Sequence, residues 1–441
     1  MRYAGRIGFV VALAVGLFAV GGVGLFRQLR STPAPSAPAQ TQEISPIQIS
    51  GSLPQLITSL QQQVRQVPGD WRSAASLGVA YIQEARVTAD PSYYPKAQAI
   101  LETSLRIDPT DNASAMIGMS ALSAARHDFS GALHWGERAK AIDPYDANVY
   151  AVIGDAQTEL GDYPQAFATY QHMVNILPAL PSYARVSYAR ELMGDVRGAI
   201  VAMKQAAGFA GSPSDSAWAD NQLGDLYFNS GRLSQASRYY RTATQADSTY
   251  VPPVAGLAKV AWAEGHTSQA ISGYKDVISR YPLPDYVIAL TDIYLRTGQK
   301  QLAAQEEAVL HTEEELFVAN GVNIDLEQAL FDASHGEPQQ GLEAARAEWQ
   351  RRHSILVADA YAWALYENGD YTDAARFEKI AMHVGMRNAL FYFHQGMIQL
   401  AFGDKGAARA ALSTAGSINP WFSIEYSSTA KTTLARLGGP A

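Results

Sequence analysis

The sequence contains no cysteine. This absence excludes disulfide bonds, thiolate metal sites, iron–sulfur clusters, a cysteine nucleophile and a lipid-modified N-terminal cysteine. The chain also has no excess of basic residues: Asp and Glu outnumber Lys and Arg by 42 to 34, and the formal net charge is −8. Because a surface that binds nucleic acid must neutralise phosphates, this charge balance argues against nucleic-acid binding.

The motifs of common enzyme classes are missing as well. The sequence has no P-loop, no dinucleotide-binding glycine pattern, no H-E-x-x-H motif and no G-x-S-x-G elbow. Its nine histidines are scattered, and none has metal-ligand spacing to a second histidine or a suitable carboxylate. We therefore predict no catalytic residue, no metal site and no cofactor. The acidic run Glu313–Glu315 is either a site for a cation or basic peptide or, as we favour, a solvated helix face.

Charge is absent from one long stretch near the N-terminus, residues 7–26 (IGFVVALAVGLFAVGGVGLF). As a helix, these residues would span roughly 30 Å, the thickness of the hydrocarbon core of a bilayer. We predict a transmembrane anchor within residues 1–30. A cleavable signal peptide is the alternative, although its apolar region is usually only about 7–15 residues long. A buried globular helix is disfavoured because the stretch has no polar face.

Arginines flank the apolar stretch on both sides, at Arg2 and Arg6 and at Arg27 and Arg30. The positive-inside bias is therefore weak, and the N-terminal amine tips it toward a cytoplasmic N-terminus. Residues 31–54 are rich in Pro, Ser, Ala and Gln, a composition that predicts a disordered spacer. We expect a single-pass membrane protein whose remaining chain lies outside the cytoplasm.

Glycine recurs every 33 to 38 residues through the rest of the chain, at Gly161, Gly194, Gly231, Gly265, Gly298, Gly336, Gly369 and Gly403. Five residues after each glycine there is an alanine (Ala166, Ala199, Ala236, Ala270, Ala303, Ala374 and Ala408), except that Gly341 follows Gly336. A proline lies seventeen residues after three of them, at Pro178, Pro282 and Pro420. These three residue types in one phase predict a repeated structural unit.

Each unit is predicted to be a helix–turn–helix. The glycine ends the first helix, because a left-handed backbone conformation is easiest without a β-carbon. The aspartate that often follows would cap the second helix (Asp162, Asp195, Asp370 and Asp404). The alanine allows the two helices to cross closely, and the proline ends the second helix.

These features resemble the tetratricopeptide repeat family, which combines an aromatic residue, a Leu-Gly pair, a Tyr, and then Gly, Ala, an aromatic, Ala and Pro. The third unit matches with Tyr150, Ile153-Gly154, Gly161, Ala166, Tyr170 and Pro178, and the fifth with Leu223-Gly224, Tyr227, Gly231, Ala236, Tyr240 and Ala243. The resemblance implies an all-α, right-handed superhelical solenoid of about ten repeats over residues 55–422, preceded by the single transmembrane helix. Residues 304–335 are irregular, and the second helix of the seventh unit looks extended there. Residues 423–441 are predicted to form a capping helix and tail.

The resemblance further implies that the first helices of the units line a concave groove. The residues that we expect to face it are Tyr188, Trp218, Asn221, Asp225, Phe228, Lys259, Trp262, Asp292, Asp359, Trp363 and Tyr366. Aromatic and polar groups together suit recognition of a peptide or a helix. Alternatively, these residues are partly core and pack between adjacent first helices. The acids at the ninth positions, Asp155 and Asp225, would repel a carboxylate, so we predict no clamp for a chaperone C-terminus.

The repeats leave no room for a separate catalytic domain of about 100 residues. The leading hypothesis is a membrane-anchored scaffold, not an enzyme, that binds peptides or partner proteins and assembles envelope or secretion machinery. The alternatives are a solenoid that binds polysaccharide or a small ligand in envelope biogenesis, or a non-catalytic subunit of an enzyme complex.

Overall fold

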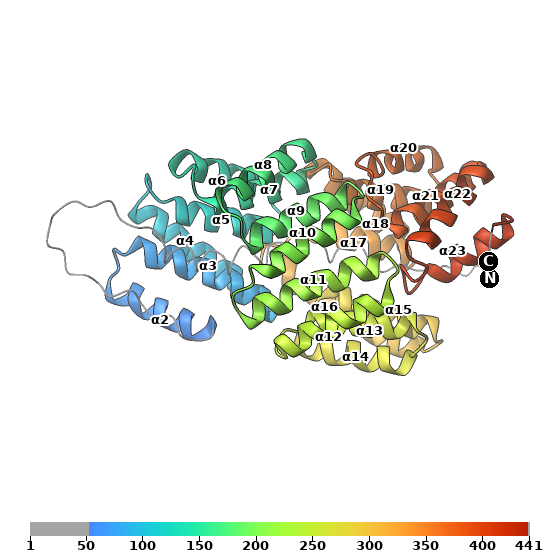
Figure 1. Ribbon diagram of the computed structural model, residues 1–441, viewed down its shortest axis with the longest axis horizontal. Helices are drawn as coiled ribbons and strands as arrows, with labels where there is room; N and C mark the ends of the chain where they lie inside the picture. The colour runs from blue at the N-terminus through green and yellow to red at the C-terminus, as the bar shows by residue number, and fades with distance from the viewer. Residues whose placement is uncertain (1–52, 440–441) are drawn as a thin grey trace.

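The computed structural model describes residues 53–439, which form 22 α-helices and no strand. Twenty of these helices make ten consecutive pairs, so the predicted number of units is confirmed (Figure 1). The pairs are α3 (Trp71–Thr88) with α4 (Tyr93–Ile107), α5 (Ala113–Ala125) with α6 (Phe129–Ile142), α7 (Ala147–Leu160) with α8 (Tyr163–Ile176), α9 (Leu180–Leu192) with α10 (Val196–Gly208), α11 (Pro213–Asn229) with α12 (Leu233–Ala246), α13 (Pro252–Ala263) with α14 (Thr267–Arg280), α15 (Pro284–Arg296) with α16 (Lys300–Ala319), α17 (Asp325–Ser334) with α18 (Pro338–Arg351), α19 (Ile355–Glu367) with α20 (Tyr371–Ala381), and α21 (Ala389–Phe402) with α22 (Lys405–Ile418). A single helix, α2 (Leu53–Gln66), precedes the pairs, and α23 (Ser427–Arg436) follows them.

The repeated residues act as predicted. All eight repeat glycines have a positive φ, between 71° and 100°. Asp195, Asp370 and Asp404 cap the next helix, because each accepts a backbone hydrogen bond at 2.8–3.1 Å. Asp162 also lies at an N-cap, but within the described residues its side chain accepts no capping hydrogen bond. The seven repeat alanines are at most 1% exposed. Gly341 replaces alanine in the eighth unit because a β-carbon there would lie 2.5 Å from the backbone nitrogen of Ala333.

A second glycine of the repeat, in the middle of the first helix, makes room for an aromatic ring. A β-carbon added at Gly154 would lie 2.4 Å from the ring of Tyr170, and one added at Gly224 would lie 2.4 Å from the ring of Tyr240. Both tyrosines come from the second helix of the same unit and are at most 1% exposed. The Gly-Tyr combination in the sequence therefore fixes how the two helices of a unit pack.

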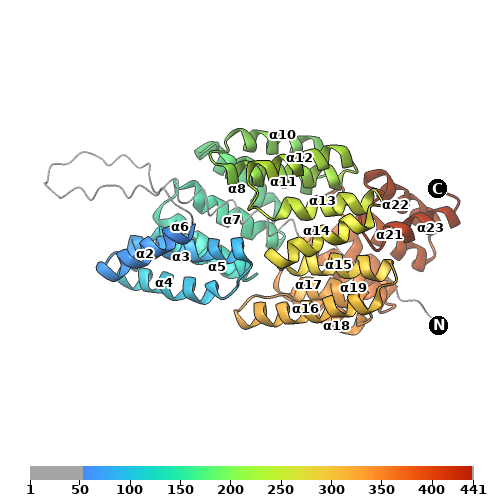
Figure 2. The same ribbon diagram turned by 90° about the horizontal axis from the view of Figure 1, so that it is seen from below.

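The array coils back on itself, so that late repeats contact early ones. The Nε atom of Arg126 donates a hydrogen bond to the Asn320 carbonyl, 194 residues further along the chain, at 3.1 Å. The backbone nitrogen of Ile355 donates to the hydroxyl of Tyr163 at 2.7 Å across 192 residues. Figure 2 shows the two turns of the coil, with α10 to α12 on one side and α16 to α18 on the other.

The repeat glycines also allow the two turns to approach each other at backbone distance. A β-carbon added at Gly161 would lie 2.5 Å from the carbonyl oxygen of His353. The next two glycines face carbonyl oxygens in the same way, Gly194 that of Gly385 and Gly231 that of Ile418. These glycines therefore end a helix within their own unit and also allow the backbones of the two turns to pack closely.

Helix α16 is extended, as predicted from the irregular sequence there. It contains 20 residues, whereas α12 and α14 contain 14 each. Its C-terminal turn carries Phe317 to the apolar cluster of the first unit, where it packs with Leu122 and Val322. The extension thus connects the seventh unit to the beginning of the array.

No helix within residues 53–439 is both long and apolar enough to cross a membrane. The predicted transmembrane helix at residues 7–26 lies outside the described residues, as do residues 31–52 of the predicted spacer. The spacer was predicted to reach residue 54, but α2 already begins at Leu53.

Candidate functional site: the inner face of the array

The first helices of the pairs carry all the residues that were predicted to line a groove. Eight of these eleven side chains are buried: Tyr188, Trp218, Asn221, Phe228, Lys259, Asp292, Asp359 and Trp363. Asp225, Trp262 and Tyr366 are partly exposed. The buried eight pack within the array, which corresponds to the alternative that they are core, and they offer no surface to a partner in this state. For the other three, a binding role stays a prediction.

The inner face is instead organised by pairs of charged or polar groups between neighbouring first helices. In the third unit, Asp155 on α7 accepts two hydrogen bonds from the guanidinium of Arg185 on α9, at 2.8 and 2.6 Å. The hydroxyl of Tyr170 donates to the same carboxylate at 3.1 Å. The two charged side chains are only 1% and 3% exposed, so each neutralises the other inside the array.

The same arrangement recurs two units later. Asp225 on α11 lies 3.6 Å from the ammonium of Lys259 on α13 and accepts a hydrogen bond of 2.7 Å from Tyr240. Asn221 donates to the other carboxylate oxygen at 3.0 Å. Burial lowers the pKa of Lys259, although the Asp225 carboxylate opposes this effect. The Lys259 ammonium also lies 4.9 Å from the centre of the Phe228 ring, a cation–π contact.

A histidine takes the place of the basic residue near the end of the array. Asp359 on α19 lies 3.0 Å from Nδ1 of His394 on α21, and both residues are at most 2% exposed. The imidazole stacks on Trp363 with the ring centres 4.2 Å apart. Phe393 and Tyr426 complete this aromatic cluster, with ring centres 4.6 Å apart. Trp363 is therefore a core residue of the last units.

One cluster brings a histidine close to two carboxylates, although none of the histidines has metal-ligand spacing in the sequence. His335, at the C-terminal end of α17, lies beside Asp292 on α15 and Glu425 in the segment before α23. One ligand atom from each residue lies within 4.8 Å of the other two. No pattern in the sequence predicts this cluster, because its members are 43 and 90 residues apart and belong to separate parts of the array.

The contact between the two turns is also ionic. Arg352 donates to Glu159 of the third unit and to Glu348 at the end of α18. All three side chains are at most 4% exposed. Burial raises the pKa of Glu159, whereas the charge of Arg352, together with hydrogen bonds from Arg351 and Arg352, lowers the pKa of Glu348 against the effect of burial. The guanidinium of Arg352 also covers the ring of Phe129 at 4.6 Å.

Sequence reasoning missed these pairs, although a signal for some of them existed. The acids Asp155, Asp225, Asp292 and Asp359 recur along the first helices, and a basic residue follows each by 30 to 43 residues, in the next unit. In the comparison with chaperone-binding repeats, Asp155 and Asp225 were treated as free acids. Their intramolecular partners Arg185 and Lys259 weaken that argument against a carboxylate.

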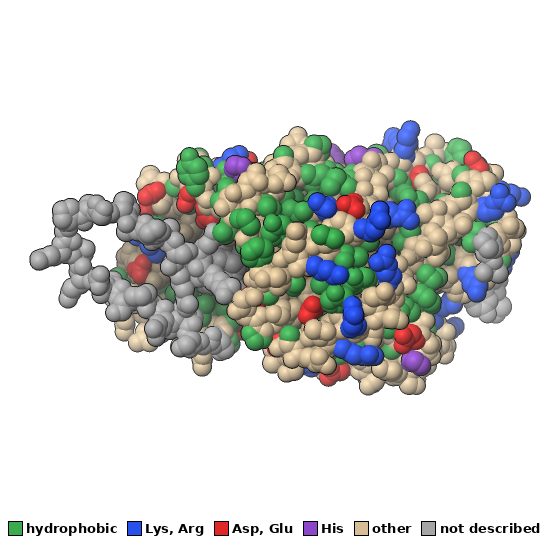
Figure 3. Space-filling model, in the orientation of Figure 1, with side chains coloured by type: hydrophobic (Ala, Val, Ile, Leu, Met, Phe, Trp, Pro, Cys, Tyr) green, Lys and Arg blue, Asp and Glu red, His purple; other side chains and the backbone are tan. Residues whose placement is uncertain are grey.

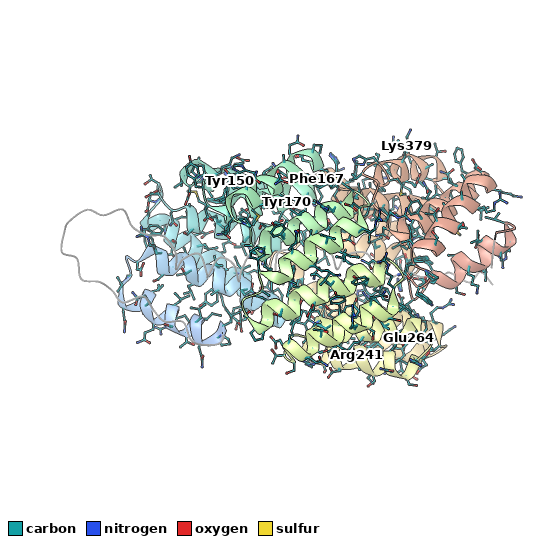
Figure 4. The ribbon with its side chains drawn as sticks, in the orientation of Figure 1. Tyr150, Phe167, Tyr170, Arg241, Glu264 and Lys379 are labelled. Atoms are coloured by element: carbon teal, nitrogen blue, oxygen red, sulfur yellow. The ribbon has the colours of Figure 1, made fainter. Side chains whose placement is uncertain are left out.

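Figure 4 labels both buried and exposed residues of the array. Tyr170 belongs to α8 and is buried, whereas Arg241, Glu264 and Lys379 are exposed. The outer surface is therefore where charged side chains are free to meet a partner.

The outer surface of α16 carries an unusual row of apolar side chains. Leu302, Val309 and Leu316 are 37%, 38% and 43% exposed. Their spacing of seven residues places them along one side of the helix. One residue of the acidic run, Glu313, lies beside this row, four residues after Val309 and three before Leu316. Glu315 is exposed and Glu314 is partly buried, 3.2 Å from Nδ1 of His311, and both lie further around the helix. In the described part of the chain, no other helix presents three exposed large apolar residues at this spacing.

A known protein family matches one segment of the chain. Residues 221–250, which cover the second half of α11 and all of α12, match the family described as "Tetratricopeptide repeat". This segment is similar to a single tetratricopeptide repeat. No curated protein matches the chain.

Several solved structures are similar to the chain at low sequence identity. A thermophilic tetratricopeptide repeat protein of Thermus thermophilus is 21% identical, with a TM-score of 0.37, over 42% of this chain and 98% of that one. The Cut9–Hcn1 hetero-tetramer of the APC/C is 15% identical, with a TM-score of 0.43, over 88% and 83%. PilW, a type IV pilus biogenesis factor, is 16% identical, with a TM-score of 0.36, over 47% and 94%.

Proposed function

We propose that this chain is a protein-binding scaffold, held at a membrane by its N-terminal segment, and that α16 is its principal binding surface. Arrays of helical repeats generally bind other proteins or peptides. The observation that carries the proposal is the exposed row Leu302, Val309 and Leu316 on the longest helix of the described chain. Exposed apolar side chains in a continuous row mark sites of interaction.

The chemistry of α16 defines the partner. Five glutamates lie on this helix, at Glu306, Glu307, Glu313, Glu314 and Glu315, against one lysine. Glu306 and Glu313 lie beside the apolar row, each four residues after one of its members. A partner helix with an apolar stripe and Lys or Arg next to it would match both the row and these two glutamates. The acidic run at residues 313–315 would then be a basic-peptide site, the interpretation that was disfavoured from sequence alone.

The test is a binding titration with a synthetic amphipathic helix built from Leu and Lys, in which binding is measured by fluorescence anisotropy of the labelled peptide. The triple variant Leu302→Gln, Val309→Gln and Leu316→Gln should weaken binding at least tenfold, because it removes the apolar contact, and should leave the thermal midpoint within a few degrees of wild type. A scrambled peptide without an apolar stripe should not bind. Wild-type affinity in the triple variant would refute this surface.

A matched control lies on other helices of the array, away from α16. Met193, Val201 and Phe209 are exposed at α9 and α10, with exposed fractions of 47%, 54% and 47%. On the face shown in Figure 3, Lys and Arg side chains gather among exposed apolar side chains. Gln substitutions at these three residues remove a similar apolar area without touching α16, so binding of the basic helix should be unchanged.

We further propose that residues 1–30 anchor the chain in a membrane and that the array lies outside the cytoplasm, where it assembles envelope or secretion machinery. The support is the uncharged stretch at residues 7–26 and the Pro- and Ser-rich residues that follow it. Sedimentation with membranes after carbonate extraction, with deletion of residues 1–30 as the control, tests the anchor. Protease added outside the inner membrane tests the orientation. Recovery of the full-length chain in the soluble fraction would refute anchoring.

The alternative of a sugar-binding groove required tryptophans accessible from the inner face. Trp218 and Trp363 are 7% and 2% exposed, and only Trp262 of the three predicted tryptophans is partly accessible. A row of stacked sugar rings would therefore need the two turns of the array to separate. A non-enzymatic role remains part of our proposal, and reproducible turnover by the purified chain would contradict it.

A further inference from the structure

Three side chains from distant parts of the sequence converge in the interior near the C-terminal end of the array. Asp292 comes from α15, His335 from the end of α17, and Glu425 from the segment that joins α22 to α23. The side chains of Asp292 and His335 are 1% and 3% exposed, and Glu425 is 5% exposed. One nitrogen and two carboxylate oxygens lie within 4.8 Å of one another. None of these groups serves the protein-binding surface on α16.

The hydrogen bonds of His335 define the state of its ring. Nδ1 lies 2.9 Å from the carbonyl oxygen of Phe331, one turn earlier on α17. A carbonyl oxygen only accepts, so Nδ1 carries the proton. Nε2 then faces Oδ1 of Asp292 at 3.1 Å. In the neutral imidazole Nε2 holds a lone pair, so it and Oδ1 face each other favourably only when a proton on the ring or on the carboxyl group joins them, or when both bind a metal ion.

The hydrogen bond to Phe331 is of the kind that metal-binding histidines make with the ring nitrogen that does not bind the metal. Such histidines almost always donate their second ring nitrogen to a carbonyl or carboxylate, which fixes the tautomer and directs the other nitrogen at the metal. His335 has this arrangement, because it lies four residues after Phe331 and stacks on that ring with the centres 3.9 Å apart. The ring is therefore held in one orientation before any ion binds.

The three groups of the cluster suit a divalent ion. Two ionised carboxylates, a neutral imidazole and a divalent ion together carry no net charge, which favours burial. The donor set of one imidazole and two carboxylates is one that Zn²⁺ accepts, with water as a fourth ligand.

We propose that Asp292, His335 and Glu425 form a binding site for one divalent transition-metal ion, with Zn²⁺ as the best match. Ligands about 2.0–2.2 Å from a tetrahedral ion lie roughly 3.5 Å apart, so the widest pair, now at up to 4.8 Å, closes by about 1 Å on binding. Neither a cysteine ligand nor a second histidine is needed. The imidazole selects transition metals over Mg²⁺ and Ca²⁺, which prefer ligand sets of oxygen only.

The site would connect three parts of the array. Glu425 belongs to the C-terminal segment, in which Asn419 donates to the Phe228 carbonyl of the fifth unit at 2.9 Å and Ile424 packs on the cluster formed by the sixth and seventh units. A metal ion would fix this segment to α15 and α17. The bound metal would therefore stabilise the closed arrangement of the two turns without taking part in catalysis.

The test is calorimetric titration of the tag-free, full-length chain with Zn²⁺, after extraction with a chelator. We expect one site per chain with a dissociation constant below about 1 µM, and a thermal midpoint that rises with Zn²⁺ but not with Mg²⁺. His335→Gln and Glu425→Gln should each weaken this site at least about 100-fold, since each removes a ligand.

His394→Gln is the matched control, because His394 is a buried histidine paired with Asp359 and lies outside the cluster. It should retain the site. Co²⁺ added to the wild-type chain should give the visible absorption of a tetrahedral nitrogen–oxygen site, a measurement that requires no variant to fold. Lack of a stoichiometric site in the wild-type chain, or a site that persists in both Gln variants, would overturn the proposal and assign His335 as an imidazolium that pairs with the two acids.

Discussion

Removal of Arg352 tests whether the two turns of the array are held together by their buried ionic contact. Arg352 is 4% exposed and donates to Glu159 of the third unit and Glu348 of the eighth. In Arg352→Met the apolar part of the side chain is largely kept, and the guanidinium is lost. Two buried carboxylates then face each other without a cation between them.

The expected cost follows from the burial. Removing one partner of a buried ion pair destabilises a protein by about 3–5 kcal/mol, because the remaining charge stays desolvated. Since Arg352 serves two carboxylates, we expect the upper part of this range, reduced only if one glutamate takes up a proton. Loss of the cation–π contact with Phe129 adds to the effect, at about 1–2 kcal/mol.

The assay is unfolding in urea, combined with small-angle scattering under native conditions. Arg352→Met should shift the unfolding midpoint strongly and increase the radius of gyration, because the early and late repeats separate. Arg376→Met is the control: Arg376 is 62% exposed and pairs with Asp373 at 3.4 Å, so its loss should cost less than about 1 kcal/mol. Equal midpoints and equal radii for the two variants would refute the view that this contact closes the coil.

Further predictions concern packing, pH and neighbouring repeats. Gly161→Ala should destabilise the protein more than Gly298→Ala, because a β-carbon at Gly161 meets the His353 carbonyl, whereas one at Gly298 meets no described atom within 4 Å. Gly298→Ala should cost about 1–2 kcal/mol, since it strains only the left-handed backbone. Equal unfolding midpoints of the two variants would contradict the close approach of the turns. Burial raises the pKa of Glu191 to about 7, so the folded state binds more protons than the unfolded state between pH 4.5 and 7. The free energy of unfolding should therefore fall by about 3 kcal/mol as the pH rises through this window. Glu191→Gln should remove this pH dependence, as measured by unfolding in urea at several pH values. Arg185→Met should cost about 3–5 kcal/mol, and the added change Asp155→Leu should recover part of it, whereas additive losses in a double-mutant cycle would show that the two groups do not interact.

The helical units were predictable because their determinants are local. A glycine that needs a left-handed conformation, an aspartate that caps the next helix and an alanine at a close crossing all act within about 35 residues. Each leaves a periodic trace, and Gly194, Asp195 and Ala199 behave as that trace predicts. The extended second helix of the seventh unit was visible for the same reason, since it interrupts the period.

The groove residues were the weaker prediction, because exposure is not a local property. The pattern predicts that Trp218, Asp292 and Trp363 face a groove, and the structure has all three buried. Whether an inner side chain is open depends on how tightly the array coils. Here Trp218 packs among residues of the fourth to sixth units, and Trp363 packs among residues of the last units and the C-terminal segment, so both are core.

The sequence by itself determined the helix pairs, their number and their order, since each depends on short-range sterics and capping repeated many times. Only the tertiary structure decided the closure of the coil, the ion pairs between neighbouring first helices, and the cluster of Asp292, His335 and Glu425. These contacts join residues 30 to almost 200 positions apart. Small rotations between successive units accumulate along a solenoid, and their sum, which no single repeat encodes, sets which distant side chains meet.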